Sequence, residues 1–228
     1  MTLSRYGLKE WVLVTIICVG LGGLFAWLAW WWAIGVVVLI WIAGAGFFRD
    51  PIRRVPVDLP EGTMLSPADG TISKVFKVDH HEATDGPAQV VRIFLSVLDV
   101  HINRSPFDGE VVSVKHTPGK YHDARTELSA KENESNLITF TIKGDELIGV
   151  RQVSGAIARR IVCPLQAGDT LKRGEKFGMI KFGSTTELIL PRPEDVEVLV
   201  AEGDKVKGGV TVLARLRPMD STSEGEAT

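Results

Sequence analysis

The sequence has few cysteines, no run of charge of one sign and no cluster of metal-binding residues. Cys18 and Cys163 are the two cysteines of the 228-residue chain, and they fall in segments of opposite character, so a disulfide framework is not expected. Neither a Cys-x-x-Cys pair nor a clustered set of Cys and His is present, and we predict no metal site. The 26 basic and 28 acidic residues are interleaved, and we therefore expect no nucleic-acid partner.

Charge is missing altogether from one long segment. Between Trp11 and Phe48 the chain contains no Asp, Glu, Lys, Arg or His, as is typical of a segment in lipid. A single helix over this run would be about 57 Å long, roughly twice the hydrocarbon thickness of a bilayer. We therefore predict two short transmembrane helices near residues 9–26 and 33–48. A cleaved signal peptide is the alternative, which the length of the run and the lack of a small-residue cleavage site disfavour.

The tryptophans and the flanking charges predict how this hairpin lies in the membrane. All six tryptophans belong to the segment, and four of them fall in WLAWWW at residues 27–32, where an interfacial hairpin tip is expected. By the positive-inside rule both outer ends should be cytoplasmic. We expect residues 1–54 to anchor the protein in the cell membrane with its remaining part at the cytoplasmic face. The flanking basic residues are Arg5, Lys9, Arg49, Arg53 and Arg54.

Residues 55–216 have the pattern of a mainly β domain. Short β-branched runs alternate with polar residues and are separated by Gly, Pro, Asp and Asn. An internal echo, AGDTLKRG at 167–174 and EGDKVKGG at 202–209, has the chemistry of hairpin turns. We expect a barrel-like or sandwich-like set of related hairpins, similar to the hybrid-motif folds of biotinyl and lipoyl domains, and a disordered tail at 217–228. The predicted strands lie within 71–78, 90–97, 109–116, 137–144, 159–165 and 196–203.

The segment KFGSTTELILP, residues 181–191, contains the candidate reactive residue. Taken alone, Gly183-Ser184-Thr185 is only a small polar turn between strands. The same chain also contains SPADGTI at 66–72 and LDVHINRSP at 98–106. These motifs have to be interpreted together.

At these motifs the chain closely resembles the phosphatidylserine decarboxylases, in particular their short bacterial and archaeal branch. The resemblance covers nearly the whole chain, because FFRDPIRRVP, SPADG, DVHINRSP, HTPGKY, KENESN, GAIARRIV and KRGEKFGMIKFGS occur in one order. Several spaced motifs in one order are much more specific than a Gly-Ser pair. The resemblance implies an enzyme that converts phosphatidylserine in the bilayer to phosphatidylethanolamine and carbon dioxide.

The resemblance also implies a zymogen that cuts itself between Gly183 and Ser184. The Ser184 hydroxyl would attack the Gly183 carbonyl, and the resulting ester would eliminate and hydrolyse to leave a pyruvoyl group at residue 184. This covalent cofactor would form a Schiff base with the substrate amine and accept the electrons released with carbon dioxide. The products would be an associated large chain, Met1 to Gly183, and small chain, and a homo-oligomer is left open. Glycine before the serine leaves the carbonyl unhindered and permits a distorted backbone.

Two further residues acquire catalytic roles through the resemblance. His101 matches a family histidine and is expected to exchange protons near neutral pH. Asp69 matches a family aspartate that orients the base or helps to activate the serine. Taken singly, an Asp-Gly pair is ordinarily a turn and a lone histidine is ordinarily structural. Their joint occurrence in matched motifs favours the catalytic roles.

One position departs from the pattern of the longer family members. They carry a second histidine three residues after the first, where this chain has Arg104, so the division of labour between cleavage and decarboxylation is open. His116 is a candidate for the missing base. His122 and the tandem His80 and His81 are expected on exposed loops.

Two cations are candidates for binding the lipid phosphate. Lys120 and Arg104 would suit an anionic headgroup near the membrane surface. A solvated lysine and a structural arginine are the equally weighted alternatives.

Two other functions also fit parts of the sequence. A membrane-tethered hybrid-motif module that binds partners without catalysis would stay uncut and be indifferent to Ser184→Ala. A decarboxylase of another serine lipid, such as archaetidylserine, would act on the same amine and carboxylate. Nothing in the sequence indicates which lipid tails the protein recognises.

Overall fold

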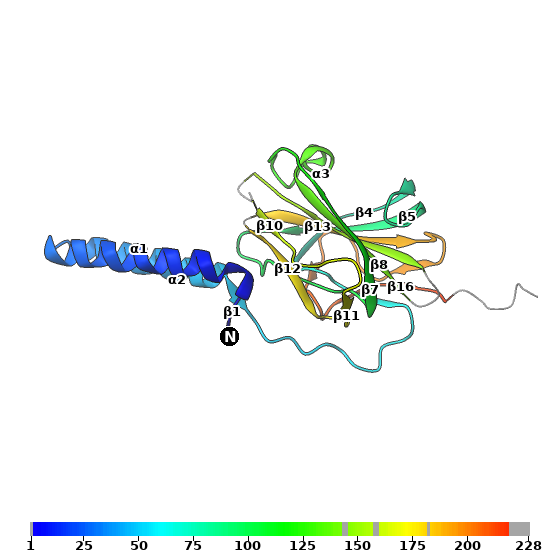
Figure 1. Ribbon diagram of the computed structural model, residues 1–228, viewed down its shortest axis with the longest axis horizontal. Helices are drawn as coiled ribbons and strands as arrows, with labels where there is room; N and C mark the ends of the chain where they lie inside the picture. The colour runs from blue at the N-terminus through cyan, green and yellow to red at the C-terminus, as the bar shows by residue number, and fades with distance from the viewer. Residues whose placement is uncertain (1, 143–145, 157–159, 182, 219–228) are drawn as a thin grey trace, which may run out of the picture.

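The computed structural model shows a pair of helices projecting from a mainly β domain (Figure 1). It describes residues 2–142, 146–156, 160–181 and 183–218. The predicted fold class, a mainly β domain with an apolar helical segment at the N-terminus, is confirmed. The outer part of the predicted tail, residues 219–228, lies outside the described residues. Arg217 is fixed to the domain, because its N–H donates to the Asp195 carbonyl at 3.0 Å, so the tail starts later than predicted.

The apolar segment forms a helical hairpin close to the predicted bounds. Helix α1 spans Leu8–Trp27 and helix α2 spans Trp31–Phe47, and Ala29 turns the chain between them with a φ of 57°. Both helices expose apolar side chains all round, as helices that face lipid do. The segment Arg5–Trp27 is long and apolar enough to cross a membrane, whereas α2 is a shorter apolar helix.

The base of this hairpin packs against the β domain. Short strands β1 (Thr2–Leu3) and β2 (Arg49–Asp50) pair there and bring the two outer ends of the hairpin together. Next to these strands, a cluster of apolar side chains joins both helices to strand β12 (Lys176–Lys181) of the domain. This cluster contains Trp11, Phe47, Phe48 and Met179. The hairpin is therefore seated on the domain and not joined to it by a loose linker alone.

The largest sheet has eight antiparallel strands in the order β11-β7-β8-β9-β13-β5-β4-β15. Strand β13 lies near its centre and pairs with β5 on one side and β9 on the other. His80 and His81 end strand β4, so the prediction that they lie on a loop is wrong. The strands of this sheet are β4 (Gly70–His81), β5 (Gly86–Leu95), β7 (Gly109–Thr117), β8 (Ser135–Thr141), β9 (Leu147–Val153), β11 (Thr170–Leu171), β13 (Ser184–Pro191) and β15 (Lys205–Val206).

Two three-stranded sheets and one short helix complete the domain. The sheet orders are β10-β12-β6 and β14-β16-β3. The runs predicted at 159–165 and 196–203 are strands over only three residues each. The elements are β3 (Thr63–Leu65), β6 (Ile102–Arg104), α3 (Glu127–Glu132), β10 (Arg160–Val162), β12 (Lys176–Lys181), β14 (Val196–Val198) and β16 (Val212–Leu216). One apolar core, including Ile93, Val150, Leu188, Phe177 and Leu213, packs the small sheets against the large one.

The strand orders reveal an internal two-fold repeat. In the large sheet, counted inwards from its two ends, β11 is equivalent to β15, β7 to β4, β8 to β5 and β9 to β13. The two-fold axis therefore passes between β9 and β13. The two small sheets, β10-β12-β6 and β14-β16-β3, are equivalent in the same way. One repeat, β6 to β12, is continuous in sequence. The other is interrupted by it and consists of β3 to β5 and β13 to β16. Ser184 therefore begins the second segment of the interrupted repeat, at the junction where the continuous repeat ends.

Two sequence pairs produce this repeat. The predicted echo is confirmed as equivalent turns, with Gly168 at φ 92° and Gly203 at φ 96°. The SPADG motif at 66–70 also has a partner, SPFDG at 105–109. In both motifs the serine hydroxyl donates to the carbonyl two residues later at 2.6 Å. The two halves of the sandwich are therefore built by the same local chemistry.

Candidate active site

Ser184 occupies a buried position at the start of strand β13. Its hydroxyl is fully buried and has no hydrogen-bond partner among the described residues. Leaving a buried hydroxyl unpaired costs about 1–3 kcal/mol, and the hydroxyls of Thr185 and Ser154 are unpaired in the same way, so the strands around Ser184 hold several unsatisfied polar atoms. Gly183 precedes it with a φ of 54°, a left-handed conformation that favours glycine. The Gly-Ser pair is thus an unsatisfied and conformationally special point of the chain.

His101 contacts the same backbone. Its ring is completely buried, and its Nε2 atom accepts the Gly183 N–H at 3.3 Å. Its Nδ1 atom lies 3.0 Å from the Asp99 carbonyl oxygen, so the tautomer with the proton on Nδ1 satisfies both contacts. Burial lowers the pKa of His101 to about 4. At neutral pH the imidazole is therefore uncharged and presents a basic nitrogen next to Gly183.

The helical anchor forms one wall of this site. The Phe47 ring at the end of α2 lies against the His101 ring, with 4.5 Å between the ring centroids. Sequence reasoning did not assign Phe47 a role, because an apolar side chain at the end of an apolar run gives no sign of its contacts. The contact places the buried histidine at the end of the domain on which the helical hairpin is seated.

Gly155 approaches the carbonyl of Gly183 closely. A Cβ atom added to Gly155 would lie 2.1 Å from the Gly183 oxygen and 3.0 Å from Ala124. Only glycine fits between these groups without displacing them. The GAIARRIV motif contains this glycine, but the sequence alone did not show which backbone it faces.

A row of hydrogen-bonded, buried side-chain amides lies on the face of strand β13 that carries Ser184. Thr186 is on the same face as Ser184, because side chains alternate along a strand, and its Oγ1 atom accepts a hydrogen bond from Asn103 at 3.0 Å. Gln152 donates to Asn103 at 2.8 Å, and Asn136 donates to Gln152 at 3.1 Å. These hydrogen bonds join strands β6, β8, β9 and β13 and make the part of the sheet that carries Ser184 rigid.

Asp69 lies in a different set of contacts. One carboxylate oxygen accepts the Gly208 N–H at 2.8 Å, and the other pairs with Arg53 at 2.5 Å. Burial raises the pKa of Asp69. Its repeat counterpart, Asp108, likewise accepts a backbone N–H, that of Arg173 at 2.9 Å, so the first contact belongs to the fold. Among the described contacts, none joins Asp69 to His101 or Ser184.

The remaining histidines are not brought to Ser184 by any described contact. His116 pairs with Glu134 at 3.0 Å on the surface, and His122 lies 3.2 Å from Glu132. The structure therefore does not place His116 as the second base.

Arg104 and Lys120 have partners of their own. Arg104 is buried, and its guanidinium donates to the Gly174 carbonyl at 2.9 Å and lies 3.6 Å from Asp50. These contacts support the structural alternative for Arg104. Lys120 is exposed and pairs with Glu132 at 2.8 Å.

A cavity of about 300 Å³ opens beside Gly183. Its walls are apolar where Phe94 and Val97 line them, and Arg125 supplies a cation in the lining. Arg125 pairs with the neighbouring Asp123 at 2.5 Å, and both side chains are exposed. Sequence reasoning missed Arg125, because a single arginine in a polar loop has no distinguishing pattern.

The loop that forms one wall of this cavity reaches the end of the anchor. Val97 and Leu98 are exposed, the latter to 79%. The Arg49 side chain, just beyond α2, donates to the Leu98 carbonyl at 2.5 Å. The cavity therefore opens close to the level at which the helical hairpin meets the domain.

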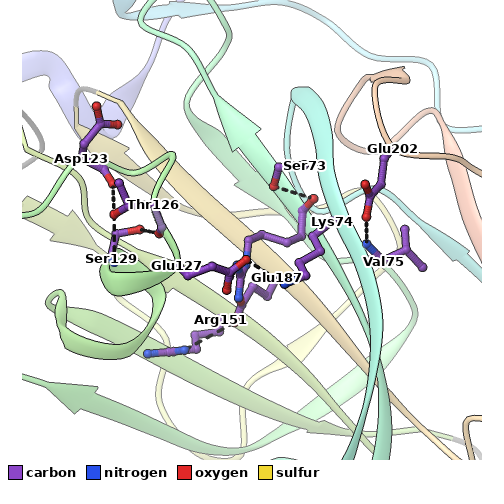
Figure 2. A network of polar contacts seen from close by, with 11 residues as sticks. Ser73, Lys74, Val75, Asp123, Thr126, Glu127, Ser129, Arg151, Glu187 and Glu202 are labelled. Carbon is purple, nitrogen blue, oxygen red and sulfur yellow. Dashed lines mark hydrogen bonds and ion pairs between the residues drawn. The ribbon is translucent and has the colours of Figure 1, made fainter.

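A second polar network lies on the other face of β13 (Figure 2). The buried carboxylate of Glu187 pairs with Arg92 of β5 at 2.7 Å and with Arg151 of β9 at 3.5 Å. Glu127 joins the network through Arg92 at 3.2 Å and Lys74 at 2.8 Å. These ion pairs tie β13 to both of its neighbours.

The fold places the candidate residues Ser184 and His101 in the β domain, at the base of an apolar helical hairpin. Comparison with known proteins identifies the kind of enzyme. The chain belongs to the phosphatidylserine decarboxylase family, whose model matches residues 44–214.

Individual relatives agree with this assignment. The chain is 42% identical over 214 residues to a protein of Rhodopirellula baltica, covering 92% of this chain and 87% of the relative. It is 44% identical over 183 residues to a protein of Carboxydothermus hydrogenoformans, covering 80% and 84%, and 43% identical over 191 residues to one of Solidesulfovibrio magneticus, covering 84% and 87%. All three are named phosphatidylserine decarboxylase proenzyme.

Proposed function

We propose that the protein converts phosphatidylserine to phosphatidylethanolamine and carbon dioxide after cleaving itself between Gly183 and Ser184. One observation carries this proposal: an unpaired, buried Ser184 hydroxyl follows a glycine whose N–H is bonded to the basic nitrogen of His101. It is the combination of the unpaired hydroxyl with the neighbouring histidine that supports a catalytic role over a non-catalytic module. The names of the relatives supply the lipid and the proenzyme state.

The residues at the site fit a pyruvoyl group at position 184. The Ser184 side chain lacks a hydrogen-bond partner among the described residues, and the adjoining Gly183 lines an open cavity. A ketone at this position would supply an electron sink for the decarboxylation of an amino-acid headgroup bound through its amine. The chain's own side chains provide burial, orientation and proton transfer around it.

For self-cleavage, His101 accepts the proton that the Ser184 hydroxyl loses as its oxygen attacks the Gly183 carbonyl, and the Gly183 N–H gives up its bond to Nε2 in this step. Its Nε2 atom is unprotonated at neutral pH and already lies at the amide of Gly183, the residue whose carbonyl is attacked. Gly183 keeps that carbonyl free of a side chain, and Gly155 allows the backbone opposite to come close. Asp69 acts at a distance, by fixing Arg53 and the turn at Gly208.

After cleavage the two chains remain together because β13 is a central strand. It pairs with β5 along Ser184 to Pro191 and with β9 along Thr185 to Ile189. The buried Glu187 ion pairs add a side-chain connection. The large chain then carries the anchor, residues 1–54, and the decarboxylase domain, residues 55–216, is shared by both chains.

The substrate enters the cavity beside Gly183 from the cytoplasmic leaflet. The anchor holds the domain against the bilayer, which is the location of a two-chain lipid. Val97 lines the cavity, and both it and the neighbouring Leu98 are exposed where the lipid would lie. Arg125 binds the phosphodiester, because its present partner is an exposed carboxylate and such a pair is weak enough to exchange.

The proposal is tested by lipid profiling in cells that cannot make ethanolamine phospholipids. We expect the wild-type protein to restore phosphatidylethanolamine at the expense of phosphatidylserine, and Ser184→Ala to restore none. Accumulation of a different decarboxylated serine lipid, or equal restoration by both proteins, would reject it.

A further inference from the structure

A second cavity, of about 470 Å³, lies between the start of the anchor and strand β10. On one side it is lined by Arg5, Tyr6, Lys9 and Glu10, at the beginning of the helical hairpin. On the other side it is lined by residues 160–164 and Lys181. It does not share a lining residue with the cavity beside Gly183.

The charges in this cavity are unbalanced. It is lined by four cations and one carboxylate, that of Glu10. Lys181, which is 6% exposed, pairs with Glu10 at 2.5 Å, and Arg160 lies 4.0 Å from the same carboxylate. One negative side chain is therefore shared between two cations.

Of the other two cations, Arg5 is attracted by Glu175 and Asp50, which lie outside the cavity lining, and Lys9 adds to the excess. Arg5 donates to the neutral hydroxyl of Tyr6 at 2.8 Å and lies 4.9 Å from its ring centroid. Lys9 has no ion-pair partner among the described residues. A group with negative charge would complete the cavity, and a phosphate matches both the arginine forks and the lysine ammonium groups.

The position of the cavity selects the source of the phosphate. Helix α1 begins at Leu8, so Arg5 and Lys9 lie at the depth of the headgroups when α1 spans the bilayer. Tyrosine at such a level is typical of the membrane interface. We propose that this cavity binds the headgroup of an anionic phospholipid, separately from the site of decarboxylation. This inference rests on the membrane placement in the proposed function and not on the chemistry at Ser184.

The test is native mass spectrometry of the full-length protein with bound lipid. The Ser184→Ala protein is used, so that the measurement does not depend on cleavage or activity. Equal amounts of phosphatidylglycerol and phosphatidylcholine are supplied as probes. We expect the protein to retain phosphatidylglycerol, and the double variant Lys9→Gln, Arg160→Gln to bind it about tenfold to thirtyfold more weakly.

Two controls distinguish binding in this cavity from nonspecific attraction between surface cations and an anionic lipid. The double variant Lys205→Gln, Lys207→Gln removes the same charge from exposed positions at strand β15 and should retain the lipid as the parent does. Equal losses in the two double variants, or no preference for phosphatidylglycerol in the parent, would overturn the proposal. Displacement of the lipid by inorganic phosphate would show a soluble anion as the ligand and would also overturn it.

Discussion

The Nε2 atom of His101 lies 3.3 Å from the amide nitrogen of Gly183. His101 directly precedes strand β6 of one repeat, and Gly183 directly precedes strand β13 of the other. Folding brings the two residues together. Because the ring is buried against Phe47, the histidine is a neutral base at physiological pH. This relationship, more than the presence of a Gly-Ser pair, supports the proposal that the junction is reactive.

The first prediction concerns the pH dependence of self-cleavage. Burial lowers the pKa of His101 to about 4 from an ordinary value of 6.5, so the base stays unprotonated over most of the acidic range. We expect the cleavage rate of freshly synthesised precursor to change little between about pH 7 and 5 and to fall towards pH 4. The unfolded chain binds this proton more readily, so the free energy of unfolding decreases as the pH falls from 6.5, the ordinary pKa, to about 4, the pKa in the folded chain.

Substitution checks the assignment of the base. His101→Asn should slow cleavage by about a hundredfold or more, whereas His116→Asn should not, because His116 contacts Glu134 at the surface. A gel-based time course of precursor loss measures both. A slowed His116→Asn with a normal His101→Asn would assign the role to the other histidine.

Gly155→Ala is expected to block cleavage. The added methyl group would meet the Gly183 oxygen at 2.1 Å, and the carbonyl that Ser184 attacks would have to move. Overpacking of this kind also costs about 1–3 kcal/mol of stability. Gly86→Ala is the matched control, since its nearest atom would be the Thr84 oxygen at 3.9 Å. Normal processing of Gly155→Ala would show that the close approach has no part in the reaction.

Glu187→Gln is expected to weaken the hold on strand β13. The substitution leaves Arg92 and Arg151 partly buried without their shared carboxylate, at a cost of about 3 kcal/mol. For a domain of this size that corresponds to a lowering of the Tm by about 6–12 °C. Glu194→Gln breaks only an exposed pair with Lys77, so its Tm should match the wild type. Thermal unfolding in detergent compares them, and equal Tm values in all three proteins would refute this role.

Arg125→Ala should raise the KM for phosphatidylserine in mixed micelles by about tenfold, with a smaller effect on kcat. Arg125 lines the cavity beside Gly183, and within the described part of the chain it forms an ion pair with Asp123. Arg125→Lys keeps the charge and should recover part of the loss. Lys172→Ala removes an exposed cation after strand β11 and serves as the control. An unchanged KM in Arg125→Ala would exclude contact with the headgroup.

Local patterns were sufficient to predict the anchor and most strands. The uncharged run and the position of WLAWWW predicted both helices, since each signal depends on neighbouring residues only. The glycines at 168 and 203 predicted equivalent turns for the same reason. The repeat between SPADG and SPFDG was not recognised, because only the strand pairing shows that the two motifs begin equivalent halves.

The long-range contacts at the site were beyond the reach of the sequence. Nothing local indicates that Phe47 packs on His101, that Gly155 faces Gly183 or that Arg104 is buried beside Asp50. Ser184, His101 and Asp69 were nominated through matched motifs. The fold joins the first two regions through Gly183 and gives Asp69 different neighbours, and their catalytic roles stay predictions.

The most direct test of the account is the intact mass of the purified wild-type protein beside Ser184→Ala. We expect the wild type to give two chains, one ending at Gly183 and one beginning at residue 184 with the mass of a pyruvoyl group in place of serine. Ser184→Ala should give one full-length chain. A single full-length wild-type chain that retains an unmodified serine would contradict the central claim.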